Sequence, residues 1–154
     1  MGEMVLLMFA FSLLMAFMSV GDSYDGLINV GGKVLCQGCA EGWTRPIQGS
    51  RVSITCYGRR QALYYGSDET RKTGKYELTV SGYIDGKKVN PRSCIVRIEN
   101  SPDPFCNIAT NVNGGSTGVR LDVPITTDPN ISKYRLHAFY FSSPFCNETH
   151  TTES

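Results

Sequence analysis

Arg51-Val52-Ser53-Ile54-Thr55-Cys56 places an apolar side chain at every second position, with polar side chains between them. This period of two is typical of a β-strand with one buried face. The same alternation recurs at residues 76–80, 94–98 and 119–123. Further strands are expected at residues 32–36, 63–65 and 134–141. Turn-forming Gly, Pro, Asn and Asp residues separate these segments, so the sequence predicts an all-β fold, with about seven antiparallel strands in a small sandwich or barrel.

The chain begins with an apolar run, residues 4–18, that contains no charged side chain. About 15 apolar residues are too few to cross a bilayer of roughly 30 Å comfortably. We therefore interpret residues 1–23 as a secretory signal peptide that is cleaved after Gly21 or Ser23. An uncleaved anchor is the alternative, because the run is preceded by Glu3 and by no Lys or Arg. Residues 24–154 then form a single domain with one core.

All six cysteines lie beyond the expected signal peptide. An even number of cysteines in a short exported domain favours three disulfides over metal binding or thiol chemistry. The sequence alone leaves their pairing open. If one strand continues through Cys36 and Cys39, the two side chains point to opposite faces and need different partners, although Gly38 could allow a turn. Cys106 is expected to fix residues 100–117, a long segment without alternation.

Two sequons agree with export and predict N-glycosylation at Asn130 (Asn130-Ile131-Ser132) and at Asn147 (Asn147-Glu148-Thr149). Such sequons also arise by chance. Unmodified asparagines in turns are therefore the alternative.

Catalytic chemistry finds little support in the sequence. Cys36 and Cys39 have the spacing of a thioredoxin-type pair, but no strand-to-helix pattern surrounds them. His137, expected in a strand, and His150, in the polar C-terminal tail, are the only histidines. Paired carboxylates for glycoside hydrolysis stay open, yet no motif singles out a pair. We expect no catalytic residue, no metal, no cofactor and no nucleic-acid partner, and no membrane partner after signal cleavage.

Basic residues are concentrated at residues 59–97, where nine Lys and Arg side chains accompany four Asp and Glu, although the whole chain carries a net charge of only +1. Such an excess is either a solvated face or a site for a polyanion. Nearby aromatic side chains either stack on sugar rings or belong to the core. The candidate ligand-binding residues are Trp43, Tyr57, Arg59, Arg60, Tyr64, Tyr65, Arg71, Lys72, Lys87 and Lys88.

Four segments of the chain are distinctive, and three of them contain five of the six cysteines: Gly32-Lys33-Val34-Leu35-Cys36-Gln37-Gly38-Cys39, residues 46–56, Thr73-Gly74-Lys75-Tyr76 and residues 93–106. In this order the segments resemble the Ole e I-like family of plant proteins, which contains the major olive pollen allergen and the extensin-like proteins. Asn113-Gly114-Gly115 and Ala138-Phe139-Tyr140-Phe141 look like the cysteine-containing domain that plant proline-rich and arabinogalactan proteins carry after a Pro-rich arm. The resemblance implies disulfides that join Cys36 to Cys106, Cys39 to Cys146 and Cys56 to Cys94.

The resemblance and the basic, aromatic residues together imply two alternative functions. The first is a secreted, non-catalytic protein of the extracellular space or cell wall that binds a pectin-like polysaccharide or a wall glycoprotein. The second is a secreted signalling or interaction protein that binds a receptor or peptide during pollen, pistil or seedling development. Because the chain has no Pro-rich stretch, an extensin-type covalent network is not expected.

Overall fold

The computed structural model describes residues 26–40 and 42–146. The predicted signal peptide and Asn147 lie outside these residues. The larger sheet is built around one long strand, β1 (Leu27–Gln37). The first part of β1 pairs with β5 (Lys75–Ser81) and β12 (Ile131–Arg135), and the last part pairs with β2 (Thr44–Pro46) and β13 (Phe139–Ser142). Two short strands extend this sheet, β11 (Thr126–Thr127) beside β12 and β9 (Ile108–Ala109) beside β13.

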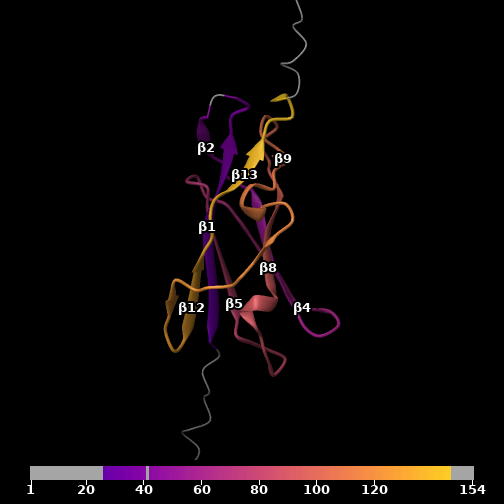
Figure 1. The fold of residues 1–154 in the computed structure, drawn as a ribbon, viewed down its shortest axis with the longest axis vertical. Coiled ribbons are helices and arrows are strands. Elements are labelled where there is room, and N and C mark those ends of the chain that lie inside the picture. The colour runs from indigo at the N-terminus through magenta and orange to yellow at the C-terminus, as the bar shows by residue number, and fades with distance from the viewer. Residues whose placement is uncertain (1–25, 41, 147–154) are drawn as a thin grey trace, which may run out of the picture.

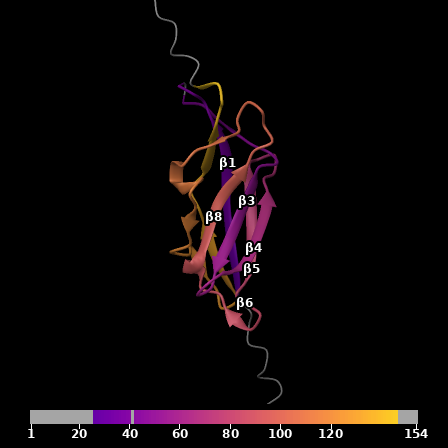
Figure 2. The ribbon, with the colours of Figure 1, turned by 90° about the vertical axis from the view of Figure 1, so that its right-hand side faces the viewer.

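The second sheet is antiparallel and has the order β10-β8-β3-β4. Its strands are β10 (Val119–Arg120), β8 (Cys94–Asn100), β3 (Arg51–Tyr57) and β4 (Ala62–Glu69). Figures 1 and 2 show an elongated molecule in which this sheet lies against the larger one, with β2 and β9 at the upper end. A separate hairpin, β6 (Tyr83–Ile84) and β7 (Lys87–Lys88), lies at the lower end (Figure 2). The described residues also form two short 3₁₀ helices, η1 (Pro91–Ser93) and η2 (Val112–Gly114). The all-β prediction is confirmed.

The core lies between the two sheets and follows the alternation in the sequence. Val52, Ile54 and Cys56 on β3 are at most 1% exposed. Phe139 and Phe141 on β13 are equally buried from the other sheet. Removing such side chains from water stabilises the fold by about 1.5–3 kcal/mol each. The apolar positions that were read as inward-facing on β3 therefore form the centre of the fold.

Tyr76 fills the core beside a glycine of β1. A Cβ added to Gly32 would lie only 2.5 Å from the Tyr76 hydroxyl, so glycine makes room for the ring. The ring lies nearly parallel to Phe139, with centroids 6.3 Å apart. Burial raises the pKa of Tyr76 well above its usual value, because the charged phenolate would lose its hydration.

Two features of the strand prediction were wrong in detail. The strand expected at residues 119–123 ends at Arg120, and Val123 is 77% exposed rather than inward-facing. The strand expected at residues 134–141 is divided into β12 and β13. His137 lies exposed in the break, not in a strand. The break lies between the two stretches of β1 with which β12 and β13 pair.

Pairing direction also differs from the antiparallel expectation, since both β12 and β13 run parallel to β1. A parallel neighbour needs a long connection rather than a tight turn, and residues 38–130 connect β1 to β12. None of the helices among the described residues is both long and apolar enough to cross a bilayer.

Three disulfides join the described cysteines, Cys36–Cys106, Cys39–Cys146 and Cys56–Cys94. These are the pairs that the resemblance implies. Cys36 and Cys39 have different partners, although β1 ends at Gln37 and does not continue through both. The Cys36–Cys106 and Cys56–Cys94 bridges are fully buried, whereas Cys39 is exposed.

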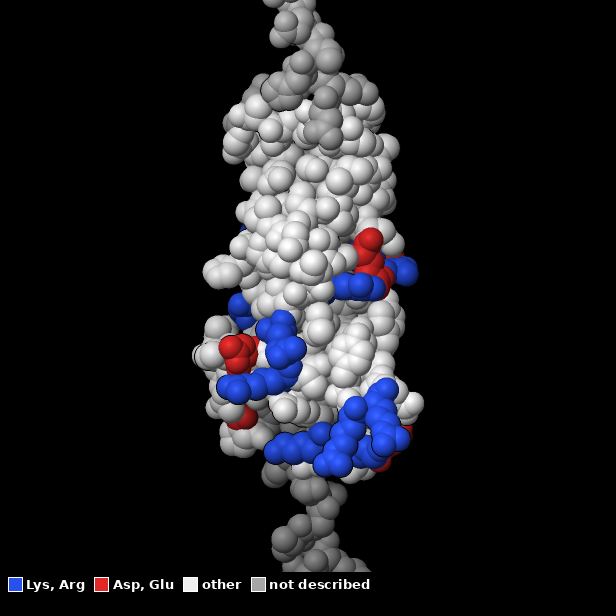
Figure 3. All heavy atoms as spheres, turned by 45° about the vertical axis from the view of Figure 1, so that its right-hand side comes forward, with Lys and Arg blue, Asp and Glu red and all other residues white. Residues whose placement is uncertain are grey.

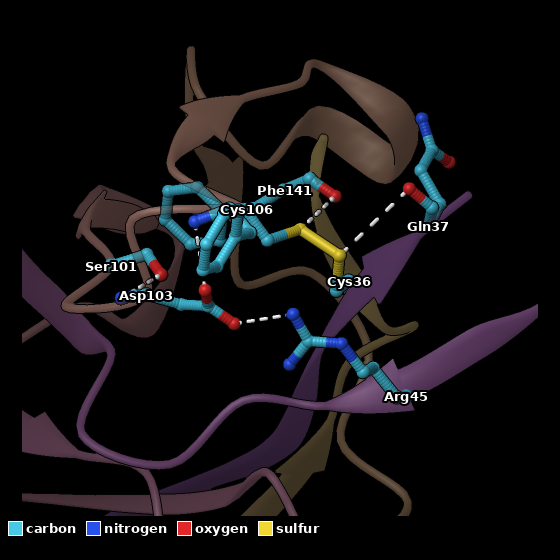
Figure 4. A network of polar contacts seen from close by, with 8 residues as sticks. Cys36, Gln37, Arg45, Ser101, Asp103, Cys106 and Phe141 are labelled. Carbon is cyan, nitrogen blue, oxygen red and sulfur yellow. Dashed lines mark hydrogen bonds and ion pairs between the residues drawn. A yellow bond between two sulfur atoms is a disulfide. The ribbon is translucent and has the colours of Figure 1, made fainter. Parts of the chain in front are cut away.

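The Cys36–Cys106 bridge belongs to a network that holds the loop before β9 in place (Figure 4). The Arg45 guanidinium forms an ion pair with Asp103, whose other carboxylate oxygen accepts the Phe105 N–H at 2.9 Å. The Asp103 N–H in turn donates to the Ser101 hydroxyl at 3.2 Å. A disulfide and a carboxylate therefore fix a loop that has little regular structure.

Neutralising Asp103 is expected to destabilise the protein in a pH-dependent way. Burial raises the pKa of Asp103, but hydrogen bonds from Arg45 and from the Phe105 N–H together lower the pKa by more, so the net shift is downward. The carboxylate therefore stabilises the fold above its unfolded-state pKa, and this contribution is lost as the pH falls through the lower folded-state pKa. Asp103→Asn should lower the free energy of unfolding by about 1 kcal/mol at neutral pH and by much less in acid.

Urea denaturation at neutral pH and at about pH 2.5, well below the unfolded Asp pKa, measures this difference. The matched control is Asp122→Asn, since the ion pair of Asp122 with Arg92 is 71% exposed on both sides. It should change stability by less than about 0.5 kcal/mol at either pH. An Asp103→Asn effect of equal size at both pH values would contradict the argument.

Candidate functional site

Two turns at the lower end of the sandwich enclose an open groove of about 940 Å³. The β3–β4 turn contributes Arg59 and Arg60, and the β6–β7 hairpin contributes Lys87 and Lys88. Tyr57, at the end of β3, also lines the groove and is 46% exposed. The remaining lining residues are Gly58, Gln61, Leu63, Asn90 and Ser93. We refer to this surface as the basic groove.

The local sequence explains why both turns are held in place. In the β3–β4 turn, the Gly58 N–H donates to the Gln61 carbonyl at 2.8 Å. In the β6–β7 turn, Asp85 and Gly86 have φ values of 51° and 74°, as a two-residue hairpin turn of type I′ requires. The Cys56–Cys94 disulfide ties the end of β3 to the start of β8, next to the lining residues Tyr57 and Ser93. The groove is therefore built on rigid elements.

The cations of the basic groove have no acidic partner among the described residues. Elsewhere among the described residues, five arginines form ion pairs: Arg45 with Asp103, Arg51 with Glu69, Arg71 with Asp68, Arg92 with Asp122 and Arg135 with Glu77. In contrast, Arg59, Arg60, Lys87 and Lys88 are exposed and form no ion pair in this part of the chain. Figure 3 shows Lys and Arg side chains gathered at the lower end of the face that it draws. The groove is thus available to an external anion.

The structure places the other candidate residues away from the basic groove. Tyr64 packs against the core. The Tyr65 hydroxyl donates to Glu99 at 2.9 Å, and this hydrogen bond is the largest cause of the raised pKa of Tyr65. Arg71 forms an ion pair with Asp68, and Lys72 lies in the turn between β4 and β5. Of the ten candidates, five line the groove: Tyr57, Arg59, Arg60, Lys87 and Lys88.

Trp43 lies at the opposite end of the molecule, just before β2. It is 45% exposed and borders a separate cavity of about 380 Å³. The other lining residues of this cavity are Gln37, Gly38, Gly42, Thr44, Val112, Asn113 and Tyr140. The structure therefore divides the candidate residues between two distant surfaces.

Four polar or apolar lining residues of the basic groove were not identified from the sequence: Gln61, Leu63, Asn90 and Ser93. Asn90-Pro91 was recognised only as a turn signal, yet Asn90 accepts the Arg92 N–H at 3.0 Å and starts η1 beside the groove. The sequence did contain one signal for Asn90 and Ser93, namely that they lie just before Cys94. The disulfide from Cys94 to Cys56 brings this turn to the end of β3.

The glycosylation candidate Asn130 is exposed in the turn between β11 and β12, and its modification stays a prediction. Among the described residues, no three His, Cys, Asp or Glu side chains lie where they could share a metal ion.

No protein-family model matches the chain. The chain is 32% identical over 120 residues to proline-rich protein 1 of Arabidopsis thaliana, covering 74% of this chain and 33% of that protein. It is 28% identical over 72 residues to the pistil-specific extensin-like protein of Nicotiana tabacum, covering 47% of this chain and 16% of that protein. The chain thus spans only about a third or less of the length of these curated relatives.

Among solved structures, the chain is similar to the major plantain pollen allergen Pla l 1. The TM-score is 0.58 at 20% sequence identity, and the match covers 77% of this chain and 95% of Pla l 1. None of these similar proteins is named as an enzyme. Together they indicate an extracellular plant protein. The chain is a relative of plant proline-rich and extensin-like proteins and has the fold of an Ole e I-like pollen allergen, as its sequence predicts.

Proposed function

We propose that this is a secreted, non-catalytic protein of the plant cell wall that binds acidic, pectin-like polysaccharide in the basic groove. The observation that carries the proposal is the gathering of Arg59, Arg60, Lys87 and Lys88 beside Tyr57 in one open groove, without acidic partners among the described residues. The relatives support the extracellular setting, since their names describe proline-rich, extensin-like and pollen allergen proteins.

The side chains of the groove suit a polyuronate in both charge and shape. A guanidinium such as that of Arg59 can donate two parallel hydrogen bonds to one carboxylate, whereas the ammonium of Lys87 acts as a compact point charge. Tyr57 offers an exposed ring that can pack against the apolar face of a sugar, with its hydroxyl free to reach water. An open groove also admits a polymer that continues beyond it at both ends.

A titration of the mature protein with de-esterified polygalacturonate tests the proposal. Because the groove cations are exposed, their attraction to uronates should be screened as salt rises from about 10 mM to about 1 M and the Debye length falls from roughly 30 Å to roughly 3 Å. We expect the affinity to fall at least about tenfold over this range. Fully methyl-esterified pectin, which lacks the charges, should bind more weakly at low salt.

Two results would contradict the proposal. Binding to polygalacturonate that does not depend on the salt concentration, or no binding at all, would exclude the electrostatic mechanism. Equal binding of polyglutamate and polygalacturonate would show that the groove selects charge alone and has no preference for a sugar.

A further inference from the structure

A second surface, at the end opposite the basic groove, is lined by described residues that carry no charge. We call it the neutral face and define it by Gln37, Trp43, Thr44, Val112, Asn113 and Tyr140, which line the cavity of about 380 Å³. No Lys, Arg, Asp or Glu is among these lining residues.

Strand register explains how the neutral face arises. Gln37 at the end of β1 is opposite Thr44 of β2 on one side and Ser142 of β13 on the other. Because Phe139 and Phe141 point into the core, alternation directs Tyr140 between them to the outside of the sheet. These side chains therefore share one face at the upper end of the larger sheet.

Trp43 is held beside this sheet by its backbone and by a glycine. The Gly38 N–H donates to the Trp43 carbonyl at 2.9 Å. A Cβ on Gly38 would lie 2.7 Å from the indole nitrogen, so glycine allows the indole to approach the chain closely. The adjacent Cys39–Cys146 disulfide ties this segment to the region after β13. An aromatic ring that is 45% exposed is thus fixed in position at the surface.

The polar side chains on the neutral face retain free hydrogen-bonding capacity among the described residues. Within the described part of the chain, neither the Gln37 carboxamide nor the indole N–H of Trp43 has a hydrogen-bond partner. The Asn113 amide nitrogen donates to the Ala138 carbonyl at 2.8 Å, which leaves the amide oxygen as an acceptor. Exposed aromatic rings beside carboxamides suit a ligand that has an apolar face and also carries hydroxyl groups.

We propose that the neutral face binds an uncharged sugar of a wall polysaccharide, with one pyranose ring stacked on Trp43 and its hydroxyls hydrogen-bonded to Gln37 and Asn113. The described lining residues carry no charge, which disfavours a uronate, because none of them is a cation that would compensate the desolvation of a carboxylate. The apolar side chains of a peptide would offer the carboxamides no hydrogen-bond partner, whereas sugar hydroxyls both donate and accept. A cavity of this volume accommodates a small number of sugar rings.

This site stands independently of the function proposed for the basic groove, because the two share no lining residue. If both sites are occupied, a single molecule binds an acidic polysaccharide at one end and a neutral one at the other. Such bivalent attachment would give this small domain a bridging role between two polymers.

The fluorescence of Trp43 tests the proposal directly, because Trp43 is the only tryptophan of the chain. The mature protein is titrated with neutral oligosaccharides of β-linked glucose, galactose, mannose and xylose, and separately with oligogalacturonate and with an uncharged apolar peptide. We expect a saturable change in tryptophan emission with at least one neutral sugar, unaffected by salt. Gln37→Ala should weaken this binding about fivefold through the loss of a hydrogen bond.

The matched control is Phe105→Ala, which removes a 67% exposed aromatic ring outside the cavity lining and should leave the affinity unchanged. A variant with the four groove cations neutralised should also retain neutral-sugar binding, which separates this proposal from the preceding one. The proposal is overturned if no neutral sugar changes the emission, if only oligogalacturonate or only the peptide does, or if Gln37→Ala binds as tightly as the wild type.

Discussion

Replacing Cys36 and Cys106 together with alanine is expected to lower the free energy of unfolding by about 4 kcal/mol. The bridge spans a sequence separation of 70 residues, and a chain-entropy model gives about this loss when the unfolded chain is no longer constrained. Both cysteines are at most 1% exposed and contact the core, so the lost packing adds to the effect. Small domains have a free energy of unfolding of only about 5–15 kcal/mol, so the variant should be only marginally stable at physiological temperature.

Urea denaturation under non-oxidising, thiol-free conditions measures this loss, with Cys39→Ser/Cys146→Ser as the comparison. That second bridge also closes a long loop, but Cys39 is exposed, so its removal should cost chain entropy with little loss of packing. Limited reduction of the native protein should likewise open Cys39–Cys146 before the two buried bridges. A loss below about 1 kcal/mol for the Cys36/Cys106 variant would contradict the entropic argument.

Local alternation predicts the strands well wherever both faces of a strand have distinct surroundings. Tyr76, Leu78 and Val80 alternate with exposed polar residues because one side of β5 faces the core and the other faces solvent. The same rule fails at Val123, which continues an alternating pattern but is 77% exposed, because β10 pairs with β8 over only two residues. The alternating pattern therefore shows which side chains a strand could bury, but they are buried only where a neighbouring strand pairs with that segment.

The direction in which neighbouring strands run could not be predicted from the local sequence pattern. Nothing in residues 131–142 distinguishes a parallel from an antiparallel neighbour, since the direction depends on the long connection from β1 to β12, residues 38–130. The disulfide pairing was likewise open to the residues alone and was indicated only by the resemblance to a family.

The candidate ligand-binding residues were grouped by sequence proximity, and the structure divides them. Arg59 and Lys87 are far apart in the sequence but line one groove, because Cys56–Cys94 brings the two hairpins together. Tyr64 and Tyr65 are neighbours, yet alternation sends Tyr64 toward the core and leaves Tyr65 54% exposed. Composition therefore indicates that cations are in excess, whereas long-range contacts decide which of them act together.

Neutralising the basic groove is expected to weaken binding to polygalacturonate on the order of 100-fold at low salt. The variant replaces Arg59, Arg60, Lys87 and Lys88 with glutamine. Each exposed contact between a cation and a carboxylate contributes about 0.2–1 kcal/mol, so four contacts together account for roughly two factors of ten. The dependence of affinity on salt should become correspondingly shallow, because fewer counterions are released on binding. Affinity electrophoresis or calorimetry at several salt concentrations measures both quantities.

A charge-matched control separates the groove from the net charge of the protein. Lys33, Lys75, Arg97 and Arg120 are exposed cations that do not line the groove, and their replacement by glutamine changes the net charge by the same amount. If binding depends on local geometry, this control should lose less than about fivefold, because its charges are spread over other faces and are screened at that distance. If both variants lose affinity equally, long-range attraction alone explains the binding. The groove would then have no particular role, and the unpaired cations beside Tyr57 would be an ordinary solvated surface.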